Sequence, residues 1–133
     1  MYLRSLLVFS LLATPAFAQD AAKGEADFKK CKACHSIIGA DGTEIVKGGK
    51  TGPNLFGVGG RQIGTYPDFK YGDAIVALGA DGTVWDEASL AAYLADPGKF
   101  LQEKTGDAAA KTKMTFKLTK GGEDMAAYLA TLK

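Results

Sequence analysis

The amino-acid sequence predicts an all-α fold in a single domain, with about four to five helices and long loops. Apolar residues recur at helical spacing in several segments, and no run of residues is typical of a buried parallel strand. Residues 19–133 have the length of one domain, and neither a linker nor an internal repeat divides them. We therefore expect one hydrophobic core, built from helices that long irregular segments connect.

Residues 1–18 have the pattern of a secretory signal peptide. Arg4 supplies the positive charge, an apolar stretch follows it, and residues 16–18 form a small-x-small cleavage site. The stretch is too short to cross a bilayer, and no later segment approaches the ~20 apolar residues that a spanning helix needs. We expect cleavage after residue 18 and a soluble periplasmic protein, residues 19–133, that is not inserted in a membrane.

The first helical segment places Ala21, Gly24, Phe28 and Cys31 on one face, at spacings of three, four and three. Glycine is a poor residue for an isolated helix, so the expected use of Gly24 is the close approach of another helix. This segment leads directly into the most informative motif of the chain.

Cys31, Cys34 and His35 form a C-x-x-C-H motif, the attachment signature of a c-type haem. Two thiols three residues apart on a helical turn can add to the two vinyl groups along one edge of the porphyrin. The histidine that follows is then placed to ligate the iron. The motif predicts covalent haem c held by Cys31 and Cys34, with His35 as a metal ligand.

Other uses of a C-x-x-C pair fit this chain less well. A zinc site needs about four protein ligands, and the chain has two cysteines and one histidine. A thioredoxin-like dithiol would lie among alternating strands and helices, which the pattern does not show. Export would permit a Cys31–Cys34 disulfide, but thioether bonds explain the histidine beside the pair better.

A glycine-rich stretch, residues 39–64, shows no sustained period and is long for a loop inside one domain. A porphyrin face would give such a loop a surface to pack against. Three helices are expected after it. The first runs from Asp73 to Leu78 and is closed by Gly79, the second runs from about Asp86 to Asp96, where Pro97 stops it, and the last runs from about Gly121 to Leu132.

A second axial ligand would decide between electron transfer and chemistry at an open iron. The chain has no second histidine, which leaves methionine, lysine or no ligand. Met125 lies on the apolar face of the last expected helix, where a core role is favoured. Met114 lies in a loop outside any helical stripe, and its own context leaves ligation and simple packing open.

The charges of the chain are nearly balanced, with 16 basic and 15 acidic residues. This balance gives no support to nucleic-acid binding. Acidic residues gather at Asp86, Glu87, Asp96 and Glu123-Asp124, away from the lysines, and the separation predicts a dipole that orients the molecule toward an acidic partner. Lysines near the haem-binding segments are Lys29, Lys30, Lys32, Lys47, Lys50, Lys99, Lys104, Lys111, Lys113, Lys117 and Lys120.

The ordered motifs together resemble the class I cytochromes c, most closely the bacterial cytochrome c2 group with its longer loops. The sequence departs from the shorter mitochondrial pattern by an insert in residues 37–50 and by a longer loop from Pro97 to Met114. The matching elements are Gly24, Phe28, residues 31–35, residues 51–55 (Thr-Gly-Pro-Asn-Leu), Gly60-Arg61, Tyr71, Trp85, Tyr93-Leu94, Asp96-Pro97, residues 112–116 (Thr-Lys-Met-Thr-Phe) and Tyr128-Leu129.

The resemblance implies a class I cytochrome c fold wrapped around one covalent haem, with Met114 as the second axial ligand. It implies that the Pro53 carbonyl accepts the outer ring N–H of His35. It also implies that Tyr93 lies near the methionine sulfur and Phe116 shields it from water. The residues implied to hydrogen-bond or neutralise the inner propionates are Arg61, Tyr71 and Trp85.

The function that the resemblance implies is one-electron transport rather than enzymatic catalysis. A monomeric carrier would take electrons from a cytochrome bc1 complex and deliver them to a photosynthetic reaction centre or a terminal oxidase. The alternative is an open-site haem protein, either a gas-binding sensor or a peroxidase-like enzyme. Peroxidase chemistry would want a distal histidine, and the single histidine of this chain is already committed.

Overall fold

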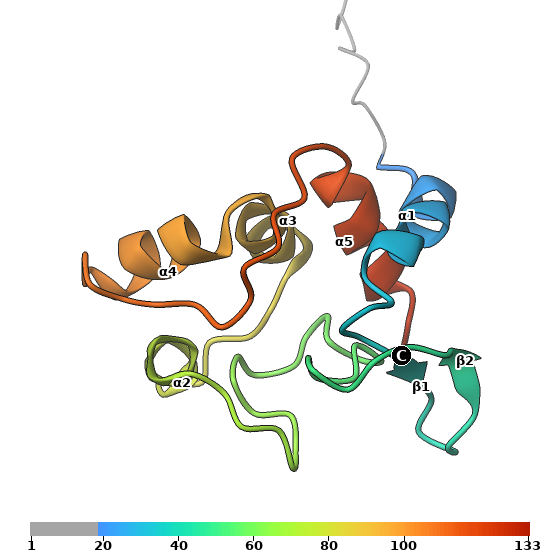
Figure 1. Cartoon of the computed structure of the whole chain (residues 1–133), viewed down its shortest axis with the longest axis horizontal. Helices are drawn as coiled ribbons and strands as arrows, with labels where there is room; N and C mark the ends of the chain where they lie inside the picture. The colour runs from blue at the N-terminus through green and yellow to red at the C-terminus, as the bar shows by residue number, and fades with distance from the viewer. Residues whose placement is uncertain (1–18) are drawn as a thin grey trace, which may run out of the picture.

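The structure is a computed structural model that describes residues 19–133, so the expected signal peptide lies outside the described residues. The helices of this part are α1 (Ala21–Asp27), α2 (Asp73–Gly79), α3 (Glu87–Ala95), α4 (Pro97–Thr105) and α5 (Gly122–Ala130), with a 3-10 turn, η1 (Phe28–Lys30), after α1. Two short strands, β1 (Ile37–Ile38) and β2 (Glu44–Val46), form an antiparallel hairpin. The prediction of a helical fold with long loops is confirmed (Figure 1).

Helices α1 and α5, from the two ends of the described chain, lie side by side (Figure 1). Gly24 is buried at their contact, and a Cβ atom on it would come within 2.1 Å of the Asp124 carbonyl oxygen. The rings of Phe28 and Tyr128 meet edge to face, with their centroids 6.0 Å apart. The expected close approach of a second helix at Gly24 is therefore confirmed.

Helix α3 begins as expected, because Asp86 caps it. The Asp86 carboxylate accepts the Ser89 N–H at 2.7 Å, and the Ser89 hydroxyl accepts the Asp86 N–H at 2.9 Å. The helix ends at Ala95, and the Asp96 carboxylate accepts the Lys99 N–H at 3.1 Å. Asp96 thereby caps a further helix directly after α3.

This further helix, α4, corrects the expectation of a loop from Pro97 to Met114. Proline is unfavourable inside a helix but suits its first turn, because the N–H that it lacks has no partner there. Phe100 and Leu101 then face the core, 5% and 1% exposed, and Gly106 ends the helix in the left-handed conformation at φ 70°. The same Asp-Pro pair ends one helix and begins the next.

Helix α2 is present where expected, but Gly79 serves a different purpose. It is the last helical residue and does not have a positive φ. A Cβ atom on Gly79 would come within 1.8 Å of the Ile63 carbonyl oxygen, so glycine is required for the contact between α2 and the preceding loop. The Gln62 side chain reinforces this contact by donating to the Gly79 carbonyl at 2.7 Å.

The expected insert, residues 37–50, contains the β1–β2 hairpin, which corrects the view of this region as having no regular structure. Ile37 is completely buried, and Ile45 is 46% exposed. In Figure 1 the hairpin lies below α1, on the side of the molecule away from α4. The insert therefore has one side chain fixed in the core.

No helix within residues 19–133 has the length and apolar character needed to span a bilayer.

One buried cluster of hydrophobic side chains joins the helices and the hairpin. Met125 is completely buried, which confirms its expected place in the core. The largest side chains with almost no exposure are Phe28, Ile37, Ile63, Pro97, Leu101 and Met125.

Candidate haem site

A mainly apolar cavity of about 360 Å³ lies between the helices and the loops. This volume is typical of small-molecule and cofactor sites. Its lining residues come from η1 and the C-x-x-C-H turn, the loop before α2, helices α2 to α5, and the segment between α4 and α5. The ten predicted site residues, all in its wall, are Cys31, Cys34, His35, Pro53, Arg61, Tyr71, Trp85, Tyr93, Met114 and Phe116.

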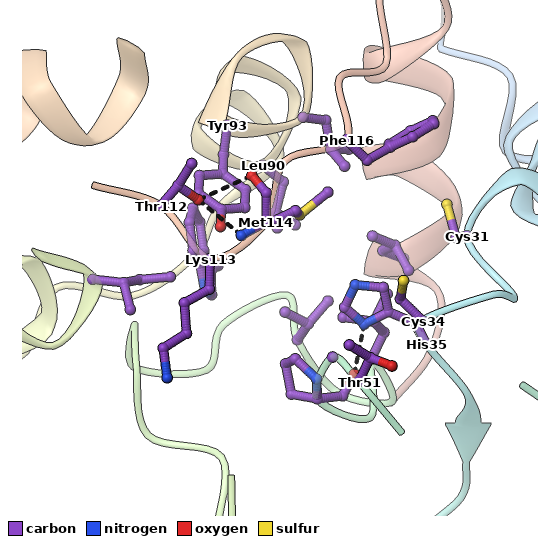
Figure 2. Close-up of a pocket in the computed structure, with 18 of the residues that line it drawn as sticks. Cys31, Cys34, His35, Thr51, Leu90, Tyr93, Thr112, Lys113, Met114 and Phe116 are labelled. Atoms are coloured by element: carbon purple, nitrogen blue, oxygen red, sulfur yellow. Dashed lines mark hydrogen bonds between the residues drawn. The ribbon is translucent and has the colours of Figure 1, made fainter. Parts of the chain in front are cut away.

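The C-x-x-C-H residues form one helical turn directly after η1. The His35 N–H donates to the Cys31 carbonyl at 2.9 Å, as expected for residues four apart in a helix. Both cysteines are free thiols; Cys31 is half-buried and Cys34 is exposed. Burial raises the pKa of the Cys31 thiol, the nearby Lys30 partly opposing this effect. This turn places both thiols and the imidazole beside the cavity (Figure 2).

The His35 imidazole is held by a single well-defined hydrogen bond. Its Nδ1 lies 2.7 Å from the Pro53 carbonyl oxygen, which can only accept, so Nδ1 carries the proton and Nε2 carries the lone pair. Burial lowers the pKa of His35, and the hydrogen bond to Pro53 partly offsets this effect. The ring is therefore a neutral imidazole with one nitrogen available to a metal.

Glycines allow the loops to lie directly against the C-x-x-C-H turn. A Cβ atom on Gly52 would come within 2.3 Å of the His35 ring, and one on Gly48 would come within 1.9 Å of the His35 carbonyl oxygen. The Gly49 N–H donates to the Lys32 carbonyl at 2.8 Å, and the Gly52 N–H donates to the Cys34 carbonyl at 2.8 Å. These contacts satisfy carbonyls that the short turn would leave without partners.

Met114 lies on the opposite side of the cavity from His35 (Figure 2). Its N–H donates to the Thr112 hydroxyl oxygen at 3.1 Å, and that hydroxyl donates to the Met114 carbonyl at 3.1 Å. The Lys113 ammonium donates to the Lys70 carbonyl at 3.0 Å, which attaches the methionine segment to the loop before α2. Local and long-range contacts therefore both fix the backbone that carries the thioether.

Trp85, from the loop before α3, and Tyr93, from α3, form part of the cavity wall, and Phe100 of α4 packs against both rings. The Trp85 and Tyr93 rings have centroids 5.1 Å apart, and each lies within 6 Å of Phe100. Burial raises the pKa of Tyr93, and a hydrogen bond with Thr112 partly opposes it. The Tyr93 hydroxyl therefore stays protonated as a polar group in an apolar wall.

Arg61 and Tyr71 line a different part of the wall and interact with each other. One Arg61 nitrogen, Nη2, donates to the carbonyls of Asn54 and Phe56 at 3.1 and 2.6 Å. The Tyr71 hydroxyl accepts the Tyr66 N–H at 3.0 Å. Burial lowers the pKa of Arg61 and raises that of Tyr71, and their mutual contact opposes both shifts. Arg61 thus braces the loop that contains Pro53 as well as lining the cavity.

Phe116 and the charged residues differ from expectation in two respects. Phe116 lines the cavity but is 42% exposed, so its ring lies at the mouth. Asp96 was grouped with the acidic residues away from the lysines, yet its carboxylate lies 2.9 Å from the Lys117 ammonium. One carboxylate therefore sits among the lysines, and the expected charge separation is less complete on this side.

The residues of the cavity fit a covalently attached haem c. Two thiols and a neutral imidazole lie along one wall, a thioether lies opposite, and most of the remaining wall is apolar. Imidazole and thioether are axial ligands of low-spin haem iron, and the C-x-x-C-H turn supplies both attachment points. An apolar wall with an arginine and hydroxyls at one part suits a large flat ligand with charged groups on one edge.

Several contributors to this geometry carry no sequence signal that reveals their contacts. The Thr112 hydroxyl, the Lys113 link and the packing of Gly48 and Gly49 involve partners far away in the chain or roles that many residue types can fill. Asn54 belongs to a motif noted in the sequence, but its hydrogen bonds to β1 become visible only in three dimensions.

Comparisons with known proteins place the chain in a family. No protein-family model matches it. The cytochrome c2 of Rhodobacter capsulatus is 68% identical over 122 residues, covering 92% of this chain and 89% of that protein. The cytochrome c-550 of Paracoccus versutus is 59% identical over 123 residues, covering 90% and 80%.

Solved structures agree with these sequence relatives. The cytochrome c2 structure from Rhodobacter capsulatus has a TM-score of 0.83 at 69% identity, over 84% of this chain and 97% of that one. The ferric cytochrome c-550 structure from Paracoccus versutus also has a TM-score of 0.83, at 57% identity, over 86% and 98%. With the C-x-x-C-H turn and the facing methionine, this likeness shows that the chain belongs to the class I c-type cytochromes, in the cytochrome c2 group.

Proposed function

We propose that this protein is a soluble periplasmic one-electron carrier whose haem iron has His35 and Met114 as axial ligands. Membership of the cytochrome c2 group makes the chain an electron carrier with one covalently attached haem c, not an enzyme. The observation that carries the finer proposal is the placement of a neutral imidazole and a thioether on facing walls of one apolar cavity.

Each side chain of the site has a definite task in this proposal. Cys31 and Cys34 form the two thioether bonds, and His35 offers Nε2 while Pro53 holds Nδ1. The bound haem supplies a one-electron couple, and thioether ligation together with burial favours its reduced form. Met114 closes the opposite side, held by the two hydrogen bonds with Thr112. Because both walls are fixed in advance, little rearrangement accompanies a change of charge.

The remaining predicted residues are proposed to pair with the charged and polar groups of the haem site or to shield it from water. Arg61, Tyr71 and Trp85 are proposed to pair with the inner propionates, whose charges are costly to bury without partners. Tyr93 is proposed to lie near the methionine sulfur, and its protonated hydroxyl would act as a donor there. Phe116, at the cavity mouth, is proposed to limit the access of water to the methionine side.

Export and partners complete the proposal. Residues 1–18 are proposed to direct export and to be removed, which leaves residues 19–133 as one haem-carrying domain that acts as a monomer. Lysines near the cavity mouth, including Lys30 and Lys113 in its wall, are proposed to guide brief docking. The proposed donor is a cytochrome bc1 complex, and the proposed acceptor is a photosynthetic reaction centre or a terminal oxidase.

Absorption spectra of the matured protein, oxidised and reduced, test the axial ligands. We expect a weak near-infrared charge-transfer band from methionine to ferric iron, and no change in the reduced spectrum when carbon monoxide is added. Met114→Leu should abolish the band and permit carbon monoxide binding, whereas Met125→Leu should keep the band. A high-spin wild-type spectrum that shifts fully with carbon monoxide would instead establish the open-site sensor or enzyme.

A further inference from the structure

The Asn54 side chain joins two parts of the chain beside the proximal histidine. Its Oδ1 accepts the Ile38 N–H at 2.9 Å, and its Nδ2 donates to the Ile38 carbonyl at 2.8 Å. One side-chain amide thus pairs with the main chain of β1 as a neighbouring strand would. Oδ1 also accepts the Phe56 N–H at 3.0 Å, which folds the loop around the same side chain.

Asn54 directly follows Pro53, whose carbonyl holds the His35 ring at 2.7 Å. The orientation of that carbonyl is set by the peptide plane between Pro53 and Asn54, because the plane contains the carbonyl of one residue and the N–H of the next. Contacts that restrain Asn54 therefore also restrain the direction in which the Pro53 carbonyl points toward the His35 Nδ1–H.

Two further contacts hold the loop of residues 53–56, which we call the Asn54 frame. Arg61 donates to the carbonyls of Asn54 and Phe56, so both ends of the turn are held from the cavity side. On the opposite side the frame rests on β1, whose Ile37 is completely buried. The hairpin thus forms a fixed base for the loop that carries Pro53.

We infer that Asn54 is a positioning residue for the axial imidazole: by binding β1 it aims the Pro53 carbonyl at His35 Nδ1 and thereby sets the donor strength of Nε2. The inference rests on the proposed ligation by His35. A ring N–H that donates a stronger hydrogen bond makes the opposite nitrogen a better donor to a metal. Loss of the Asn54 amide should therefore weaken the ring hydrogen bond and favour the ferrous state.

Hydrogen exchange of the His35 ring N–H, followed by proton NMR in the reduced, matured protein, tests this role. Asn54→Asp keeps an acceptor for Ile38 and Phe56 but loses the donor, and Asn54→Leu loses all three hydrogen bonds at similar size. We expect ring N–H exchange, measured relative to the slowest core amides, to become faster in the order wild type, Asn54→Asp, Asn54→Leu. The change should reach about tenfold in Asn54→Leu, as expected for one weakened hydrogen bond. The reduction potential should rise in Asn54→Leu, which adds no charge near the imidazole.

Gln62→Leu provides a matched control. It removes a partly buried hydrogen bond from a side-chain amide to a backbone carbonyl, that of Gly79, at 2.7 Å, and Gln62 does not line the cavity. This variant should leave the relative exchange of the His35 ring N–H and the potential unchanged, even if it lowers stability.

Unchanged relative exchange in both Asn54 variants would overturn the inference, and so would equal acceleration in Gln62→Leu. Asn54→Asp retains two of the three hydrogen bonds, so the test remains available if Asn54→Leu does not mature. The wild-type absorption spectrum reports separately on the axial ligands. A protein with a His/Met spectrum and unchanged ring exchange would disprove only the role of Asn54.

Discussion

At the scale of single residues, the absence of a side chain at Gly52 matters as much as the imidazole beside it. His35 can rest against the loop only because position 52 has no Cβ, which would lie 2.3 Å from the ring. The backbone of the same residue donates to Cys34, and its neighbour Pro53 accepts from the ring. The packing of the ring against the loop, the hydrogen bond to Cys34 and the hydrogen bond from the ring to Pro53 all depend on this close approach. A side chain at position 52 would prevent it.

Gly52→Ala should destabilise the matured protein by about 1–3 kcal/mol, the usual range for overpacking, because either the ring or the loop must move. Chemical denaturation followed by absorbance measures this change in the free energy of unfolding. Gly98→Ala is the control. A Cβ on this α4 residue would make ordinary contacts with Thr112 at 3.6 Å and Asp96 at 3.7 Å, so the change should cost nothing or add stability. Equal losses in both variants would contradict the steric argument.

At the scale of elements, the junction between α3 and α4 holds together two helices and the methionine segment. Asp96 caps α4 through the Lys99 N–H and pairs with Lys117, while the Leu118 N–H donates to the Leu94 carbonyl at 2.8 Å. The segment after Met114 is thus attached to the end of α3. Phe100 of α4 then packs against Trp85 and Tyr93, the two aromatic residues that line the cavity on this side.

The charge of Asp96 should make this junction dependent on pH. The Lys117 ammonium and the Lys99 N–H hold the pKa of Asp96 below its ordinary value of 3.8. A lowered folded-state pKa means that the stabilisation is present above pH 3.8 and is lost as the pH falls through the folded-state value. Asn caps helices as well as Asp does, so Asp96→Asn removes only the charge. Its Tm should lie below that of the wild type at pH 6, and the difference should disappear near pH 2. A constant difference would refute the ionic contribution.

Helix α4 should contribute directly to stability through Leu101, which is 1% exposed. Leu101→Ala should lower the free energy of unfolding by about 2–5 kcal/mol, because it removes buried methyl groups and leaves a cavity. The exposed Glu103, on the same helix, provides a comparison: Glu103→Ala should change stability by at most about 0.5 kcal/mol. Denaturant unfolding of the two variants measures both values, and similar losses would show that α4 does not pack as described.

At the scale of the whole molecule, the net charge and the local charge lead to different expectations. The formal net charge of the full chain is +1, so long-range attraction to any partner is weak. Lysines nevertheless line the cavity, and only some of them have a carboxylate partner nearby, as Lys30 has in Asp27 at 3.4 Å. A small reagent that reaches the cavity mouth should therefore experience positive charge.

Electron exchange with small inorganic reagents should reveal this local charge. Reduction by the anion ferrocyanide should slow as ionic strength rises from about 0.01 to 0.1 M, where the screening length falls from about 30 to 10 Å. A cationic cobalt complex should show the opposite dependence. Stopped-flow absorbance measures both rates. Rates that are independent of salt for both reagents would show that the net charge dominates and that the lysines do not guide docking.

Several features of this protein depend on residues that lie close together in the sequence. The C-x-x-C-H turn, the capped start of α3 and the apolar stripe of α5 depend on contacts within a few residues, so spacing alone predicts them. Gly24 was also recognisable, because a glycine inside a helical stripe implies a close neighbour. The resemblance to a family added the prediction that Met114 is the second ligand, a role that its local context left open.

The tertiary structure decided what depends on residues far apart in the chain. Pro97 could end a helix or begin one, and the burial of Phe100 and Leu101 against the core selected the second role. Gly79 could have been a helix cap, but the approach of the Ile63 backbone made it a contact residue instead. The pairing of Asn54 with β1 likewise has no local signature. Local chemistry thus determined which groups the site contains, while packing determined how they are held, because packing depends on partners that sequence spacing does not identify.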